Sequence, residues 1–279
     1  MKRTYGVIGG DRRQAELAAL LRKKGRRVQT WQVDGEEGDL ELAAAADVVI
    51  LPLPLCRGAG ILNWAGGEMP VEELFQRFRP GQLLLAGQVA AAERQAAEAR
   101  GLTLTDYFLS EELTVANAAA TAEAALQVAM EHLDRTLLGM DCLVLGFGRI
   151  GRLLACRLHG IGARVAAAAR KPSDRAWIRA YGWAALDTGA LTGCLGPFRV
   201  IFNTVPACLL DRALLKEVAR DCLLVDLASV PGADQAAAEE LGIPWIWARS
   251  LPGRLVPATA AAAIGDAVDS ILKERGDLM

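Results

Sequence analysis

The strongest chemical signal in the sequence is the run Gly146-Phe147-Gly148-Arg149-Ile150-Gly151. It follows an apolar stretch at residues 142–145, typical of a buried strand, and it opens a helical pattern over residues 149–158. In this context Gly-x-Gly-x-x-Gly predicts a dinucleotide-binding turn, with the pyrophosphate held by free N–H groups at the start of the helix. The first glycine permits the turn, the second lets the ligand approach, and the third allows close packing. A glycine-rich turn without a ligand is the alternative.

The next predicted strand, residues 164–169, bears on the choice of cofactor. An NAD site would offer an Asp or Glu at its end to the ribose 2′-hydroxyl. Here the strand is followed by Arg170, Lys171 and Ser173. Because a guanidinium matches a 2′-phosphate, we expect NADP to be preferred or both cofactors to be accepted. The alternative is that Arg170 merely lies along the surface.

Two later strand ends carry polar residues. One segment leaves the predicted strand at residues 200–203, and the other leaves the strand at residues 223–226. Ligands bind at the carboxyl ends of parallel strands, so we expect both segments to line the nicotinamide side of the site. The cofactor contacts predicted there are Asn203, Thr204, Val205, Pro206, Ala228 and Ser229. For Asn203 and Asp226 a purely structural capping role is an equal alternative.

The first third of the chain has a related strand, turn and helix at residues 7–14, without the dinucleotide spacing. Its turn carries Asp11, Arg12 and Arg13, and a helix start with two guanidinium groups suits a small anionic substrate. Solvated surface arginines are the alternative. In the later helical stretch Asn117 and Thr121 share a face at i, i+4 spacing, and we expect both to contact the substrate.

Other catalytic constellations are missing from the sequence. His132 and His159 both fall late in predicted helices, where an imidazole most often interacts with terminal carbonyls. No Asp, Glu, His or Cys cluster has metal-ligand spacing, and no Gly-x-Ser-x-Gly elbow occurs. The residues therefore favour a redox reaction that needs no metal.

The elements that must position these residues follow two separate β/α alternations, which predict two Rossmann-like parallel-sheet domains joined by a long helix. We expect a substrate and catalytic domain at residues 1–110, a connecting helix at 111–138, an NAD(P)-binding domain at 139–252 and a C-terminal helix at 253–279. That last helix would pack at the domain interface or cap the first domain. The predicted strands are residues 5–8, 28–33, 47–51, 83–85, 103–108, 141–145, 164–169, 200–203, 223–226 and 245–247.

Composition narrows the class of protein. The 279 residues are 52% hydrophobic, enough for two cores, and 31 basic residues nearly balance 33 acidic ones. This balance argues against nucleic-acid binding. The six cysteines form no Cys-x-x-Cys pair, and no uncharged run is long enough to span a membrane. We therefore expect a reduced, cytoplasmic, soluble protein.

Several motifs in one order give the chain a family resemblance. They are the glycine turn with Ala168-Ala169-Arg170, the stretch Asp226-Leu227-Ala228-Ser229-Val230-Pro231-Gly232, the stretch Leu251-Pro252-Gly253-Arg254-Leu255-Val256-Pro257, the opening Gly10-Asp11-Arg12-Arg13-Gln14 and the helical Asn117…Thr121-Ala122-Glu123. Over almost its entire length the chain resembles the A subunit of bacterial dipicolinate synthase. The sequence departs from that pattern at Ala233, Gln235 and Arg249-Ser250, and it has Arg254 where the family has lysine.

The resemblance implies a dehydrogenase that oxidises dihydrodipicolinate to pyridine-2,6-dicarboxylate with NADP or NAD during endospore formation. It also implies a flavoprotein-like B subunit of dipicolinate synthase as partner and a place in the mother cell, and we expect a homo-oligomer. The two substrate carboxylates call for cationic anchors, for which Arg12, Arg13 and Arg254 are the candidates. For the proton acceptor Glu123, Asp11, Asp226 and water stay open.

Three other functions compete with this one. A 2-hydroxyacid dehydrogenase has the same two-domain plan, but its chemistry calls for a His after Asp226, and none occurs there. An S-adenosylhomocysteine hydrolase-like protein shares the cofactor fold, but this chain is short for one. A non-catalytic NADP(H)-binding regulatory protein would bind cofactor without turnover.

Overall fold

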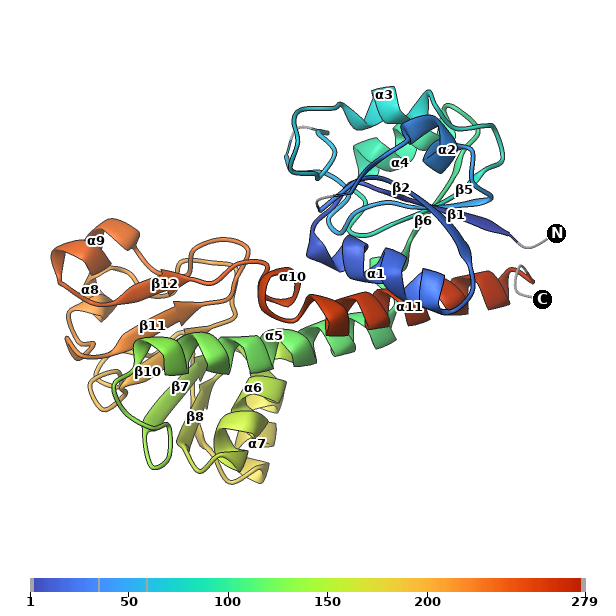
Figure 1. Cartoon of the computed structure of the whole chain (residues 1–279). Helices are drawn as coiled ribbons and strands as arrows, with labels where there is room; N and C mark the ends of the chain where they lie inside the picture. Colours follow the sequence, from blue (N-terminus) through green and yellow to red (C-terminus); the bar gives the residue numbers. More distant parts are fainter. Residues whose placement is uncertain (1–2, 35, 59, 277–279) are drawn as a thin grey trace. The chain divides into compact units, whose positions relative to one another are not determined.

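The computed structural model describes residues 3–34, 36–58 and 60–276. The chain divides into two compact units. The first consists of residues 1–117 together with 252–279, and the second of residues 118–251. Each unit is built on its own six-stranded sheet (Figure 1).

In the first unit the strand order is β3-β2-β1-β4-β5-β6. The strands are β1 (Thr4–Ile8), β2 (Arg27–Val33), β3 (Glu36–Gly38), β4 (Val48–Ile50), β5 (Leu83–Ala86) and β6 (Thr103–Asp106). All neighbours pair in parallel except β3, which runs antiparallel to β2 at the edge and was not predicted. The chain reverses direction across the sheet between β1 and β4, so the turns after these two strands lie side by side.

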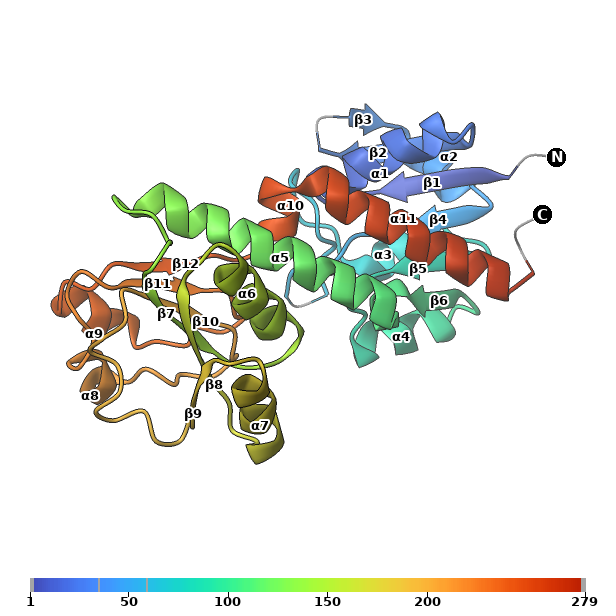
Figure 2. The same cartoon turned by 90° about the horizontal axis from the view of Figure 1, so that it is seen from below.

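Helices cover both faces of this sheet. One apolar cluster joins β1, β4 and β5 to α1 (Arg12–Lys23) and α11 (Pro257–Glu274). A second joins the other face to α2 (Leu40–Ala44), α3 (Val71–Phe75) and α4 (Ala91–Glu98). Although more than 200 residues separate them in sequence, α11 packs along α1 within this unit (Figure 2).

The second unit has the equivalent strand order, β12-β11-β10-β7-β8-β9, but here every pair is parallel. Its strands are β7 (Asp141–Leu145), β8 (Arg164–Ala168), β9 (Ala184–Leu186), β10 (Val200–Asn203), β11 (Leu223–Asp226) and β12 (Trp245–Trp247). The helices α6 (Arg149–Gly160) and α7 (Pro172–Ala180) lie on one face, and α8 (Arg212–Leu215) and α9 (Gln235–Glu240) on the other. Here the direction reverses between β7 and β10.

The predicted two-sheet α/β fold is confirmed, but the edge strand β9, like β3, was not predicted, and the connecting helix ends earlier than expected. The long helix α5 (Glu111–His132) ends at His132 and not at Leu138. The chain has to turn there to enter β7: Leu137 is buried, Met140 donates its N–H to Leu137, and Gly139 takes a φ of 70°. The short η1 (Tyr107–Leu109) and α10 (Leu251–Leu255) complete the described elements.

Two composition-based expectations can be compared with the structure. The six cysteines are all free thiols. None of the helices in the described part of the chain combines the length and hydropathy needed to cross a membrane.

Candidate functional site

The glycine turn of the second unit lies where its sheet reverses direction. Gly146 has a φ of 98°, and a Cβ on it would lie 2.3 Å from Oγ1 of Thr204, in the turn after β10. A Cβ on Gly151 would lie 2.1 Å from the carbonyl oxygen of Gly146, so only glycine lets α6 start this close to the strand. A Cβ on Gly148 would meet nothing within 4 Å, so the backbone there is open to a ligand.

The first turn of α6 is electrostatically suited to an anion. Its N-cap residue, Gly148, has no side chain to accept the first N–H groups, and the first turn contains no acidic residue. A helix start of this kind presents its partial positive charge and its N–H donors to whatever binds there. The residues present therefore fit a pyrophosphate, and residues 146–151 would hold it.

The matching turn of the first unit is closed by its own side chains. Asp11 caps α1 by accepting the N–H of Arg13, and Gln14 reaches back to the N–H of Asp11. The N–H of Gly10 donates to Asn63. Because these N–H groups are already hydrogen-bonded, the start of α1 cannot bind a phosphate as the start of α6 can. Two sheets with the same strand order thus differ in the chemistry of the turn at the point of reversal.

Arg13 was predicted as a substrate anchor or as a solvated surface residue. Its side chain is only 7% exposed and forms a 2.8 Å ion pair with Asp11, and it also donates to the carbonyl of Leu53 in the turn after β4. Arg12, in contrast, is exposed at the same helix start. The charge of Arg13 is therefore compensated within the protein, and Arg12 is the more accessible of the two.

The Leu-Pro-Gly segment at residues 251–253, which is far from Asp11 and Arg13 in sequence, contacts this ion pair. A Cβ on Gly253 would lie 2.7 Å from Oδ2 of Asp11 and 3.0 Å from Nε of Arg13. Because Gly253 has no side chain, the backbone of α10 packs directly against the ion pair. The next residue, Arg254, is exposed. The structure brings these two predicted substrate motifs together within the first unit.

The turn after β8 holds the predicted NADP contacts. Arg170, Lys171 and Ser173 are all exposed at the start of α7. No acidic side chain takes the position of the Asp or Glu that an NAD site offers, because β8 is followed by Ala169 and Arg170. The local charge at this turn favours an anionic group.

Asn203 and Asp226 form a buried pair at the ends of β10 and β11. The side-chain amide of Asn203 donates to Asp226 (2.9 Å), and Asp226 also accepts the N–H groups of Ala228 and Gly232. Asp226 is 1% exposed. This geometry favours the capping role that the sequence left open, since Asp226 shapes the loop that carries Ala228 and Ser229.

The predicted residues on α5 fall in different surroundings. Glu123 is exposed and pairs with Arg157 of α6 at 2.9 Å. Thr121 is buried in the second unit, and Asn117 is half-buried at the end of the first. The carboxylate of Glu123 is thus held by a guanidinium.

Among the residues that the structure describes, no carboxylate contacts either histidine in a way that would mark an acid–base pair. Nδ1 of His132 lies 2.8 Å from the carbonyl of Val128, the helix-end interaction expected for it, and the ring of His159 stands against Trp183. Within the described ranges, no group of three or more His, Cys, Asp or Glu side chains could hold a metal ion.

Two arginines that shape these turns were missed by sequence reasoning. Arg152 donates to the carbonyl of Phe147 and pairs with Asp174, and its guanidinium lies 5.0 Å from the centre of the Phe147 ring. Arg175 donates hydrogen bonds to two backbone carbonyls in the turn after β8. Arg152 follows the glycine motif by one residue, but nothing in the sequence indicates which carbonyl an arginine will reach.

Comparison with known proteins decides the family resemblance. Residues 4–108 match the model of the N-terminal domain of the dipicolinate synthase A subunit. The chain is 27% identical to the dipicolinate synthase A subunit of Bacillus subtilis, over 96% of this chain and 95% of that protein. The resemblance to this family is confirmed. The crystal structure of the dipicolinate synthase A subunit from Bacillus halodurans is also similar, with a TM-score of 0.84, 26% identity and 98% of each chain covered.

The fold of this chain is also similar to that of more distant proteins. A transhydrogenase from Sinorhizobium meliloti matches with a TM-score of 0.71 at 16% identity, covering 98% of this chain and 85% of that one. At this identity the likeness shows the fold alone, an α/β fold with two sheets.

Proposed function

We propose that this protein is the nicotinamide-dinucleotide-dependent component of a dipicolinate synthase. It would oxidise dihydrodipicolinate to pyridine-2,6-dicarboxylate, with NADP or NAD as hydride acceptor, in the mother cell of a sporulating bacterium. The observation that carries the proposal is the uncapped, acid-free start of α6 at the reversal point of the second sheet, in a chain similar to the dipicolinate synthase A subunit along nearly its full length. A complex with a flavoprotein-like B subunit and a homo-oligomeric state belong to the same proposal.

The second unit would bind the cofactor. Residues 146–151 would hold the pyrophosphate, and Arg170, Lys171 and Ser173 would face a 2′-phosphate. The loops shaped by Asn203 and Asp226 would line the nicotinamide side through Thr204, Val205, Pro206, Ala228 and Ser229. The bound cofactor supplies the hydride acceptor.

The first unit would bind the dicarboxylate. Arg12 and Arg254 are exposed, and the Asp11–Arg13 pair and Gly253 fix the backbones that carry them. A guanidinium fork suits a carboxylate, so we assign one carboxylate to each of these two arginines. Asn117 of this unit is a further substrate contact in this proposal, whereas Thr121 is buried and belongs to the second unit. Holding the ring in one orientation is the main contribution of these groups to the rate.

One proton leaves the ring together with the hydride. The candidate carboxylates are already engaged: Asp226 with three donors, Glu123 with Arg157 and Asp11 with Arg13. Because the product ring is aromatic, loss of the proton is favourable, and we assign it to water. Glu123→Gln and Asp226→Asn test this assignment, since replacing a true proton acceptor would remove both the activity and the acidic limb of the pH–rate profile.

The test is to follow reduction of NADP⁺ or NAD⁺ by absorbance, with dihydrodipicolinate generated in situ, and to identify the product. Assays with and without the candidate B subunit show whether the chain acts alone. We expect cofactor reduction matched by dipicolinate formation, and a loss of about 100-fold or more in kcat/KM for Arg254→Ala. Cofactor binding without product, even with the B subunit present, would contradict the assignment and favour the regulatory role.

A further inference from the structure

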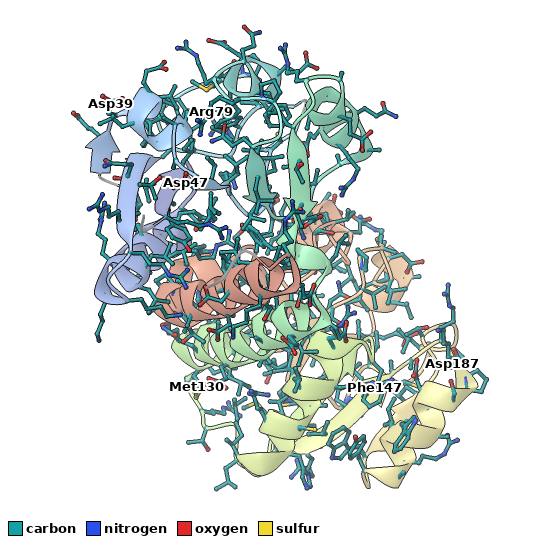
Figure 3. The ribbon with its side chains drawn as sticks, turned by 90° about the vertical axis from the view of Figure 1, so that its right-hand side faces the viewer. Asp39, Asp47, Arg79, Met130, Phe147 and Asp187 are labelled. Carbon is teal, nitrogen blue, oxygen red and sulfur yellow. The ribbon has the colours of Figure 1, made fainter. Side chains whose placement is uncertain are left out.

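Arg175 of α7 forms hydrogen bonds to the backbone of the turn that follows β8. Its Nη1 lies 3.0 Å from the carbonyl oxygen of Ala169 and 2.8 Å from that of Arg170, and it donates to both. The same guanidinium forms a 2.8 Å ion pair with Asp187, the residue after β9, which is labelled in Figure 3. The Arg175 side chain is 20% exposed, so it is largely packed beneath the turn.

These bonds fix the direction in which the next side chains leave the backbone. The last residue of β8 is Ala168, so the peptide groups after Ala169 and Arg170 lie beyond the strand. Their two carbonyls accept from one planar guanidinium, which holds both peptide planes. Arg170 stands between these planes, and its side chain therefore starts from a preset direction.

The charges at the turn divide into two sets. The charge of Arg175 is offset by Asp187 at ion-pair distance. Arg170 and Lys171 are exposed and supply the positive charge that a ligand would meet. We therefore expect Arg175 to act by holding the backbone of the turn, and not by attracting an anion directly.

We propose that Arg175 is a positioning residue that selects for the 2′-phosphate of NADP without touching it. It orients Arg170 by bonding the two carbonyls, and Asp187 holds it in place. This inference rests on the proposed binding of a dinucleotide by the second unit. The competing arrangement has Arg175 itself contacting the phosphate.

Removal of Asp187 separates these two arrangements. In the positioning arrangement, Asp187→Asn loosens Arg175 and weakens NADP⁺ binding. If Arg175 contacted the phosphate, the same substitution would release its charge and strengthen NADP⁺ binding. Arg179→Met is the matched control, because it removes one positive charge one turn further along the same helix, from an exposed side chain.

The experiment measures the Kd of NADP⁺ and of NAD⁺ by calorimetry for the wild-type chain and for Arg175→Met, Asp187→Asn and Arg179→Met. We expect Arg175→Met to raise the Kd of NADP⁺ about tenfold and that of NAD⁺ less than about twofold, because a misplaced Arg170 would lose its charged hydrogen bond to the phosphate. Asp187→Asn raises the Kd of NADP⁺ as well, and Arg179→Met leaves both nearly unchanged. Should Arg175→Met fail to fold, Arg175→Lys takes its place, with a smaller rise expected.

Several results would overturn the inference. An unchanged Kd of NADP⁺, an equal rise for both cofactors, or tighter NADP⁺ binding by Asp187→Asn would each do so. A wild-type chain that binds NAD⁺ but not NADP⁺ would also overturn it and leave the dinucleotide proposal standing. If the chain bound neither cofactor, both this inference and the proposal of dinucleotide binding would be wrong.

Discussion

At the scale of single residues, the site depends on the absence of a side chain at two glycines. Gly148 leaves the helix start open, and Gly151 leaves room for the carbonyl of Gly146. We expect Gly151→Ala to lower the Tm and to abolish detectable NADP⁺ binding, because its Cβ would overlap that carbonyl and push α6 away. Gly160→Ala is the control on the same helix: its Cβ meets nothing within 4 Å, and helix propensity predicts a gain of about 0.5 to 1 kcal/mol. Equal behaviour of the two variants in thermal melts and titrations would show that the packing argument is wrong.

At the scale of elements, hydrogen bonds at strand ends fix how β1 and β4 start together. The N–H and hydroxyl of Thr4 both donate to Asp47, and the N–H of Asp47 donates back to the Thr4 hydroxyl. The backbone bond, followed by the hydroxyl bond, holds the pKa of Asp47 below its usual value. The resulting stabilisation is present above the unfolded-state pKa and is lost as the pH falls through the folded-state pKa.

We therefore expect Thr4→Val to destabilise the protein by roughly 0.5 to 1 kcal/mol at neutral pH, and by less at an acidic pH below the folded-state pKa of Asp47. Urea unfolding at both pH values measures this difference. In an Asp47→Asn background the cost of Thr4→Val should no longer depend on pH. A cost that stays constant with pH in the wild-type background would rule out the carboxylate as its cause.

At the scale of the whole molecule, two units share one strand order but only one has an open glycine turn. We expect NADP⁺ to slow amide hydrogen exchange in residues 146–151, 169–173 and 203–206 of the second unit. The turn at residues 9–13 of the first unit is already closed by Asp11 and Gln14, so its exchange should change little on cofactor addition. Hydrogen exchange followed by mass spectrometry tests this, and preferential protection of residues 9–13 would show that the cofactor binds the first unit instead.

The sequence by itself determined what depends on local pattern. Alternating apolar runs predicted the strands, with β7, β10, β11 and β12 at the bounds observed, and the spacing of Gly146, Gly148 and Gly151 predicted the turn. Tertiary structure decided which groups pair across large separations in sequence. Asp11 with Gly253, Asn203 with Asp226 and Glu123 with Arg157 depend on the strand order and on helix packing. The edge strands β3 and β9 and the end of α5 also escaped prediction, because each is set by what it packs against. Periodicity reports which face of an element is buried, whereas the partner of a polar side chain is fixed only once distant segments have come together.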